Sequence, residues 1–268
     1  MLELHHFGFS TCSQKVRLVL AEKQLDFVSH EVDILNGGQH DPAYVRLNPN
    51  HVVPTLVHDG AVLLESTLIN EYLDDAFPAV PLRPADPVAR HATRLWTKFL
   101  DEKVHSATAA VTFAIGPRSI ILQQPEAERE ANLAGIPDAK ERAARRSVLA
   151  HGVKAPEFAG ALAHMVELLD RVERALGAAP WLSGDAYGLA DAAVTPYVLR
   201  LDHLAMTPLL SAPARPRLGD WFDRVRARPN FATAVAAWAP EPAVAFLRMT
   251  GDAVWPEVEP LATAAGRA

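Results

Sequence analysis

A run of prolines in the first third of the chain limits its fold more than any other feature. In FPAVPLRPADP the prolines stand at positions 78, 81, 84 and 87. Prolines at this density break helices and strands, so the segment is predicted to be a stiff linker. The hydrophobic patterns on its two sides differ. The sequence therefore predicts two domains, residues 1–78 and 88–268, joined by a linker at 79–87.

The first predicted domain alternates between strand and helix patterns. Apolar residues alternate or cluster where strands are expected and recur every three to four residues where helices are expected. Two apolar runs joined by Asp59-Gly60 indicate a β-hairpin. The predicted elements are a strand at 2–7, a helix at 12–23, a strand at 25–34, a short helix at 42–47, the hairpin, and a helix that Ser66 caps and that ends before Pro78. This order predicts an α/β domain on a small mixed sheet.

The second predicted domain has only helical periodicity, and we expect it to be all-α. Apolar positions recur at helical spacing in 88–113, 157–176, 190–204 and 216–227. Between them, residues 113–156 form an extended, charge-rich segment with two interpretations: a solvated helical excursion, or a cap over a substrate cleft. The Pro- and Ala-rich tail after Pro240 is expected to wrap the surface or fray.

Composition excludes several classes of function. The net charge is −6 and the pI near 6.0, whereas binding to nucleic acid or to an anionic membrane needs concentrated positive charge. No apolar run approaches the ~18 residues of a spanning helix, and no secretory signal is visible. A single cysteine allows no internal disulfide, which suits the cytoplasm. The eleven histidines show no metal-ligand spacing, so no metal site is expected.

The stretch FSTCSQKVR, which holds that cysteine, lies where the first strand gives way to the first helix. The helix N-terminus favours an anion and lowers the pKa of a thiol placed there. A hydroxyl could instead donate to a thiolate carried by a ligand. Equally, Ser10 and Ser13 are ordinary N-cap residue types. A C-x-x-C redox pair is excluded, because Lys15 occupies the second position of such a pair.

Two further pairs are candidate binding groups. If the Val53-Pro54 bond is cis, the backbone amide and carbonyl of Val53 would face outward to pair with an extended peptide ligand; an ordinary trans proline opening an edge strand is the alternative. Glu65 and Ser66 stand at the start of a helix, where free amides bind a carboxylate and Glu65 can accept from an ammonium group. Together they would hold the head group of an α-amino acid.

These three features match the thiol, backbone and amino-acid ends of glutathione, and the chain resembles the soluble glutathione transferases along both domains. STCSQKVRLVLAEKQLDF is similar to the first-helix motif of Zeta-like bacterial members, NPNHVVPTLVHDG to the cis-proline strand, and ESTLINEYLDDAFP to the γ-glutamyl-binding helix. LSGDAYGLADAAVTPYVLRL resembles the family's helix cap with a buried aspartate. The resemblance implies a thioredoxin-like first domain and a helical second one.

The resemblance also implies roles for individual residues. Ser10 falls where Ser-type members carry the hydroxyl that activates the thiol, Cys12 on the Zeta-motif cysteine, and Ser13 on the position used by some ether-cleaving members. The implied glutathione-binding groups are Val53 with Pro54 for the cysteinyl backbone, Glu65 and Ser66 for the γ-glutamyl end, and Gln39 or His40 near the glycyl end. Asp191 would be structural. Gly188 departs from the family's usual Ser or Thr, which weakens the cap.

We therefore expect a cytoplasmic, dimeric detoxifying transferase that uses glutathione to attack a hydrophobic, aromatic electrophile, by conjugation or by ether cleavage. The charge-rich segment resembles that of the bacterial β-etherase branch. Two alternatives stay open. Cys12 could be the nucleophile of a thiol transferase or reductive dehalogenase, or the chain could bind glutathione or apolar ligands without catalysis.

Overall fold

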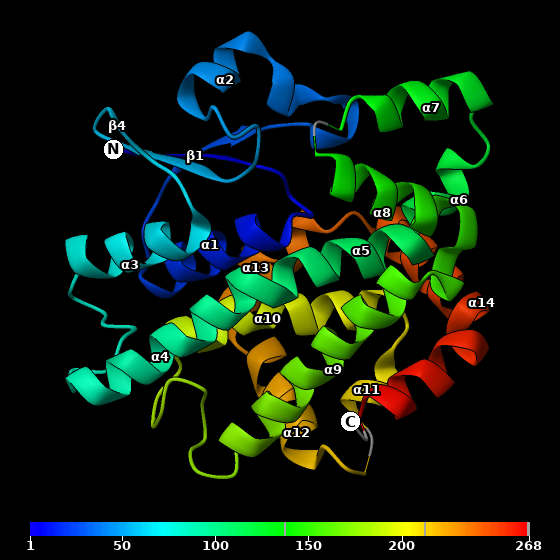
Figure 1. The fold of residues 1–268 in the computed structure, drawn as a ribbon. Helices are drawn as coiled ribbons and strands as arrows, with labels where there is room; N and C mark the ends of the chain where they lie inside the picture. The colour runs from blue at the N-terminus through cyan, green and yellow to red at the C-terminus, as the bar shows by residue number, and fades with distance from the viewer. Residues whose placement is uncertain (137, 212, 267–268) are drawn as a thin grey trace. The chain divides into compact units, whose positions relative to one another are not determined.

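The computed structural model describes residues 1–136, 138–211 and 213–266, and its elements confirm an α/β fold followed by helices (Figure 1). The chain divides into two compact units. The first consists of Met1–Thr97, Ala179–Pro196 and Asp220–Pro240, and the second of Lys98–Ala178, Tyr197–Gly219 and Glu241–Ala268. The domain boundaries drawn from the sequence stay a prediction. Pro137, inside the charge-rich segment, lies outside the described residues.

The first unit contains a four-stranded mixed sheet in the order β2-β1-β3-β4. Its strands are β1 (Leu2–His6), β2 (Val28–Glu31), β3 (Thr55–His58) and β4 (Ala61–Leu63). β1 runs parallel to β2 and antiparallel to β3, and β3 and β4 form the expected hairpin. Asp59 and Gly60 both have positive φ, at 49° and 88°, as a two-residue hairpin turn requires. β2 is shorter than the strand predicted at 25–34.

The two faces of the sheet carry different helices (Figure 1). α1 (Thr11–Glu22) and α3 (Ser66–Ala76) lie side by side on one face, and α2 (Pro42–Leu47) lies on the other. Side chains of β1 alternate accordingly, so that Leu4 is fully buried whereas Glu3 and His5 are partly exposed. The core between the sheet, α1 and α3 is aliphatic; its fully buried members include Leu4, Val16, Val19, Leu20, Leu56, Ile69 and Leu73.

The proline-rich segment after α3 is held by Asp74, near the end of that helix. Leu82 N and Arg83 Nε each donate to the Asp74 carboxylate at 2.8 Å. Lys23 Nζ lies 2.7 Å from the same carboxylate and donates to the backbone carbonyls of Phe77 and Val80. These groups are buried, so each bond satisfies an otherwise desolvated charge or amide. The segment is therefore fixed to the first unit.

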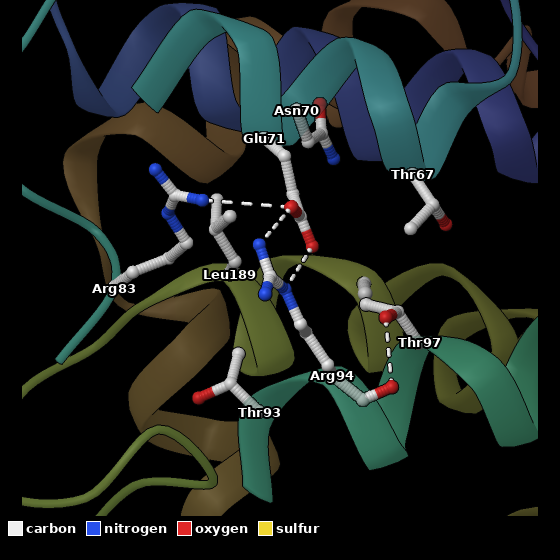
Figure 2. A pocket seen from close by; sticks show the side chains of 9 residues that line it. Thr67, Asn70, Glu71, Arg83, Thr93, Arg94, Thr97 and Leu189 are labelled. Atoms are coloured by element: carbon white, nitrogen blue, oxygen red, sulfur yellow. Dashed lines mark hydrogen bonds and ion pairs between the residues drawn. The ribbon is translucent and has the colours of Figure 1, made fainter. Parts of the chain in front are cut away.

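A small cavity beside this segment is lined mainly by polar residue types and is structural (Figure 2). Glu71 points between two arginines: Arg94 donates to it through Nε and Nη2 at 3.0 and 2.8 Å, and Arg83 Nη1 lies 3.5 Å away. The cavity holds only about 10 Å³, roughly the space of one water molecule. It is too small for a substrate.

The later segments of the first unit are organised by the buried carboxylate of Asp191. It accepts hydrogen bonds from the amides of Leu182, Ser183 and Gly188 and from Trp221 Nε1, at 2.9 to 3.1 Å. Burial raises the pKa of Asp191 despite these donors. Asp191 thus bonds back to the start of its own helix, which is the structural role expected from the sequence.

The second unit is helical throughout its described part. α5 (His105–Ile115) packs on α9 (Pro156–Ala175). The other helices of the chain are α4 (Pro87–Phe99), the π-helical η3 (Leu100–Val104), α6 (Pro117–Ile121), α7 (Glu126–Ala134), α8 (Ala139–His151), α10 (Leu189–His203), α11 (Thr207–Leu210), α12 (Pro216–Arg226), α13 (Pro229–Ala234) and α14 (Glu241–Ala265). Five short 3₁₀ or π segments complete the described elements: η1 (Ile34–Asn36), η2 (Gly38–His40), η3, η4 (Gly152–Lys154) and η5 (Ala236–Trp238).

The charge-rich segment forms α6, α7, α8 and η4, and part of it belongs to the core of the second unit. Leu133, Val148 and Leu149 are buried, and the guanidinium of Arg145 lies 4.0 Å from the ring centroid of Phe113 on α5. The segment is thus helical as expected; some of its apolar side chains pack in the core of the unit, whereas Ile120 and Leu122 are exposed.

The expectation that the tail after Pro240 wraps or frays is wrong. It forms α14, in which Leu247, Val258 and Ala262 are buried. At Gly251 a Cβ atom would lie 1.9 Å from the carbonyl oxygen of Leu204, so this glycine permits a close helix contact. The contacts of these buried apolar side chains stabilise α14 despite the two prolines inside the helix. Among the described residues, no helix combines the length and apolarity needed to cross a membrane.

Candidate active site

The N-terminus of α1 is built as the sequence predicted. Ser10 is the N-cap, and its backbone is extended, with φ of −72° and ψ of 128°. Its Oγ accepts a hydrogen bond from the Ser13 amide at 3.3 Å. The cap satisfies one of the four amides that a helix start leaves without an intrahelical partner. The first turn contains no acidic side chain to neutralise its positive end.

This geometry leaves the Ser10 hydroxyl suited to donate. Its oxygen already accepts from an amide, so its proton can point away from the helix toward an anion. Ser10 is partly exposed, as a residue that meets a ligand must be. A thiolate placed there would meet both the hydroxyl and the helix terminus, and each favours the charged form of the thiol.

The other two candidates occupy different environments. Cys12 is partly buried within the first turn of α1. Ser13 is fully buried, and its Oγ accepts from the Phe7 amide at 3.4 Å. The Ser13 hydroxyl is therefore engaged by the backbone that precedes the helix, whereas Ser10 and Cys12 both retain exposed surface.

Arg17, which sequence reasoning did not single out, holds the loop that leads into Ser10. It is 1% exposed. Its Nη2 donates to the carbonyl of Gly8 at 2.6 Å and its Nε to the carbonyl of Ala234 at 2.7 Å. At Gly8 a Cβ atom would lie 2.6 Å from the Trp238 carbonyl oxygen, so the loop accepts only glycine there. The available signal in the sequence was a basic residue inside the apolar run from Val16 to Leu20.

His6 completes this buried cluster. Arg17 Nη1 lies 2.9 Å from His6 Nδ1, and because arginine only donates, Nδ1 accepts and the proton sits on Nε2, which donates to Ser29 Oγ at 2.9 Å. Burial and the charge of Arg17 lower the pKa of His6 to about 4. Burial also lowers the pKa of Arg17 to about 9. At neutral pH the pair is a neutral imidazole beside a guanidinium.

The Val53-Pro54 peptide bond is cis, the first of the two alternatives. Within the described residues, the backbone amide and carbonyl of Val53 have no hydrogen-bond partner. A side-chain network fixes the preceding loop. Tyr44 Oη donates to the carbonyl of Val52 at 2.6 Å, Asn48 Nδ2 donates to the same carbonyl at 2.8 Å, and Asn48 also donates to Thr55 Oγ1 at 3.0 Å.

The start of α3 differs by one residue from the predicted cap. Glu65, not Ser66, is the N-cap; its φ is 67° and its side chain caps no amide. Ser66 is the first helical residue and is buried, while the Glu65 side chain is exposed. The left-handed backbone at Glu65 turns the chain into the helix one residue earlier than the serine hydroxyl suggested. Both residues still stand beside the unpaired amides of a helix start.

Gln39 and His40 lie in η2, which packs against α2. His40 is exposed, and its Nδ1 lies 3.3 Å from Nδ1 of His51, a residue that sequence reasoning missed. Gln39 Nε2 lies 3.2 Å from His40 Nε2. His51 precedes the cis-proline loop and has a positive φ of 56°. The two chain segments therefore present adjacent imidazoles.

Comparisons with known proteins cover both halves of the chain. A family model described as the N-terminal domain of glutathione S-transferase matches residues 9–76, and one described as its C-terminal domain matches residues 138–224. Protein LigF of Sphingobium sp. (strain NBRC 103272 / SYK-6) is 31% identical over 241 residues, which are 85% of this chain and 90% of LigF. A tetrachloro-p-hydroquinone reductive dehalogenase of Sphingobium chlorophenolicum is 31% identical over 240 residues, 87% of this chain and 95% of that protein.

Solved structures show the same architecture. The structure of beta-etherase LigF from Sphingobium sp. strain SYK-6 matches with a TM-score of 0.75 and 30% identity, over 87% of this chain and 98% of that one. A theta class glutathione S-transferase from the citrus canker pathogen Xanthomonas axonopodis pv. citri, with glutathione bound, matches with a TM-score of 0.62 and 26% identity, over 87% and 96%. The fold class expected from the sequence is confirmed.

Proposed function

This chain belongs to the glutathione S-transferase family, and we propose that it activates the glutathione thiol for attack on a hydrophobic, aromatic electrophile. The observation that carries the proposal is the Ser10 hydroxyl at the N-terminus of α1, where its oxygen accepts from the Ser13 amide and its proton is available to a ligand. Hydroxyl and helix terminus together favour the thiolate of bound glutathione.

The reaction follows from that stabilisation. Bound glutathione loses its thiol proton to water, and the Ser10 hydroxyl donates a hydrogen bond to the resulting thiolate. The thiolate sulfur attacks an electrophilic carbon of the substrate and forms a carbon–sulfur bond. In a substitution or an ether cleavage, the bond from that carbon to the leaving group breaks, and the leaving group departs as an anion that water protonates.

The remaining candidates would bind the rest of glutathione. The amide and carbonyl of Val53, which precede the cis bond to Pro54, would pair with the cysteinyl backbone as a strand edge does. Glu65 would accept from the γ-glutamyl ammonium group, and Ser66 with the free amides of α3 would bind its carboxylate. Gln39 and His40 would lie near the glycyl carboxylate. Cys12 and Ser13 flank the thiol end.

The relatives support the substrate class. One similar protein is named a beta-etherase and another a tetrachloro-p-hydroquinone reductive dehalogenase; the second name specifies a chlorinated aromatic ring. Conjugation of an aromatic electrophile or cleavage of an aromatic ether fits both names.

We propose further that the protein is a cytoplasmic homodimer without a nucleic-acid or membrane partner. Light scattering of the purified protein would test the dimer, and fractionation of cells would test the location.

A second candidate function rests on Cys12, which lies partly exposed in the first turn of α1. Its thiolate would attack the glutathionyl sulfur of a mixed disulfide, release the substrate's thiolate, and itself become glutathionylated. A second glutathione would then attack that disulfide, which regenerates the Cys12 thiolate and releases glutathione disulfide. The similarity to a reductive dehalogenase supports this candidate.

Binding of glutathione tests the proposed function directly. Titration calorimetry of the intact protein should detect saturable glutathione binding. Ser66→Ala should weaken it about ten- to hundredfold, because the lost hydrogen bond is to a charged group. Ser106→Ala is the matched control: that serine lies in α5, where its hydroxyl bonds only to a backbone carbonyl among the described residues, and affinity should not change. Absence of glutathione binding in the wild-type protein would refute the proposal.

A further inference from the structure

A second set of donor atoms lies on the sheet, in residues to which no role in glutathione binding has been assigned. Glu3 and His5 are two residues apart on β1, so their side chains lie on the same face. His30 lies on the neighbouring parallel strand β2 and is the register partner of His5. Pairing of the two strands therefore brings a carboxylate and two imidazoles together on the face that also carries α2.

The donor atoms of this cluster already lie close together. His30 Nε2 is 2.9 Å from Glu3 Oε2, and the ring centroids of His5 and His30 are 4.5 Å apart. One donor atom from each of the three residues lies within 4.8 Å of the others. Donors bound to one tetrahedral metal ion lie about 3.3 Å apart, given metal–ligand distances near 2.0 Å. The donor atoms would therefore have to move closer by only about 1 to 1.5 Å, together with a rotation of the stacked rings.

The surroundings of these three side chains would allow a metal ion to bind, in addition to the contact between His30 and Glu3. All three side chains are partly exposed, so a metal ion and a water ligand can reach them. The Tyr44 ring of α2 lies 6.0 Å from the His5 ring, centroid to centroid. Backbone pairing of β1 with β2 fixes the positions from which all three side chains project, and ligands on rigid strands lose little freedom on binding.

We propose that Glu3, His5 and His30 form a binding site for a divalent transition-metal ion of the zinc type. Two imidazole nitrogens and one carboxylate oxygen are a ligand set that zinc accepts, with water in the fourth position. The His5 and His30 rings are stacked, with an interplanar angle of 16°. A metal ion lies in the plane of each imidazole that binds it, so binding would tilt the rings apart. The proton that His30 Nε2 donates to Glu3 would be released to solvent.

Calorimetric titration with ZnCl₂ tests this site. The protein is used without an affinity tag, after treatment with a chelator and in buffer free of glutathione, because free thiols compete for zinc. We expect one equivalent of zinc to bind. His5→Gln, His30→Gln and Glu3→Gln should each weaken binding by more than about tenfold, since even loss of a residue that only orients a ligand costs 10- to 100-fold. Circular dichroism would confirm that each variant is folded.

The second unit offers a matched control. His164 of α9 has a side-chain exposure of 42%, close to the 39% of His30, and its Nδ1 lies 3.6 Å from Glu167. Among the described residues this pair has no second imidazole near enough to complete a ligand set. His164→Gln should leave zinc affinity unchanged. Zinc binding of undiminished affinity in the three cluster variants would overturn the proposal, as would no binding to the wild-type protein.

Cobalt replaces zinc as a spectroscopic probe and separates this site from binding at the single cysteine. Co²⁺ held by nitrogen and oxygen should give visible d–d bands without the near-ultraviolet charge-transfer band of a cobalt–thiolate bond. A strong thiolate band would place the metal at Cys12 and overturn the assignment. His30→Gln should abolish the visible bands, whereas His164→Gln should leave them.

Discussion

At the scale of single residues, the chemistry of the thiol depends on whether Ser10 or Cys12 meets the sulfur. If Ser10 stabilises the glutathione thiolate, Ser10→Ala should lower kcat/KM about 100-fold, the effect of removing one preorganised donor. The pH at which activity rises should shift upward, because the thiol then ionises less readily. Cys12→Ala should remain within about twofold of the wild type. Rates of thiol conjugation measured against pH provide the comparison.

The opposite result would favour the thiol-transfer function. In that case Cys12→Ala would abolish turnover with mixed-disulfide substrates, and Ser10→Ala would retain it. Labelling of Cys12 by iodoacetamide as a function of pH gives an independent measurement, because only the thiolate reacts. Labelling that persists well below pH 8 would identify a thiol activated by the N-terminus of α1.

His6 is a second residue whose charge state should be measurable, through stability. Its pKa is about 4 in the folded protein and about 6.5 when unfolded, so the unfolded chain binds the proton more tightly. Acidification from pH 6.5 to pH 4 should therefore lower the free energy of unfolding, by up to about 3 kcal/mol from this group, and above pH 6.5 the effect vanishes. Burial lowers the pKa of His203 to about 3, with the same sign.

Urea unfolding between pH 7 and pH 4.5 would measure this dependence. His6→Gln should have a shallower slope of unfolding free energy against pH, while the contribution of His203 persists. The slope is the quantity to compare, because the variant also loses the hydrogen bond from Arg17 and will be less stable at every pH. Equal slopes in the two proteins would show that His6 does not titrate as its buried position implies.

At the scale of elements, the start of α10 shows how a missing cap is replaced. Gly188 lacks the hydroxyl that usually occupies this position, but Ser183 Oγ accepts from the Ala190 amide at 3.1 Å. A Cβ atom on residue 188 would lie 2.3 Å from the Leu82 carbonyl oxygen and 2.6 Å from Ser183 Oγ. The glycine and the distant serine therefore belong together: the serine supplies the acceptor, and the glycine leaves room for it.

Restoring the usual cap residue should accordingly destabilise the protein. We expect Gly188→Ser to lower the free energy of unfolding by about 1 to 3 kcal/mol, as overpacking does, because the obstructing atom belongs to backbone. Ser183→Ala should cost about 1 kcal/mol, the usual effect of losing an N-cap. Thermal unfolding of both variants measures the effects. A Gly188→Ser variant more stable than the wild type would contradict this account.

The elements also show which features a sequence can reveal. The N-cap of α1 and the Asp59-Gly60 hairpin were predictable, because local residue types determine them. The cap of α3 was misplaced by one residue, since the positive φ of Glu65 has no signature in its side chain. The tail was misjudged because prolines suggested irregular structure, whereas buried contacts stabilise α14.

Features assembled from distant segments could not be predicted at all. Arg17 meets the carbonyl of Ala234 across 217 positions, and His5 meets His30 only because β1 and β2 pair. Both depend on tertiary contacts that leave no local spacing in the sequence. Ser10, Cys12, Glu65 and Ser66 could be proposed from the sequence because they lie at helix starts, where local pattern and chemistry coincide. Gln39 and His40, in η2, have no such local signal and follow only from the resemblance.

At the scale of the whole molecule, the segment 113–156 is the part whose contribution to function is least constrained by its structure. Deleting residues 118–150 would remove Val148 and Leu149, which are buried in the second unit, so loss of activity would mix folding with substrate binding. Ile120 and Leu122 offer a cleaner change. They belong to the same segment, at α6, and their side chains are exposed apolar surface, which an aromatic substrate could cover.

If the segment contributes apolar surface to substrate binding, the double variant Ile120→Ser with Leu122→Ser should raise the KM for a bulky aryl substrate several-fold. Glutathione affinity should stay unchanged, because the candidate glutathione residues all belong to the first unit. Stability should change little, since both substitutions are at exposed positions. Met249→Ser, which alters a more exposed apolar side chain on α14, is the control and should leave the aryl KM and the glutathione affinity unchanged. An unchanged KM for the aryl substrate in the double variant would show that these side chains are solvated surface with no part in binding. An equal loss of affinity for the aryl substrate and for glutathione would mean that the segment acts only by stabilising the fold.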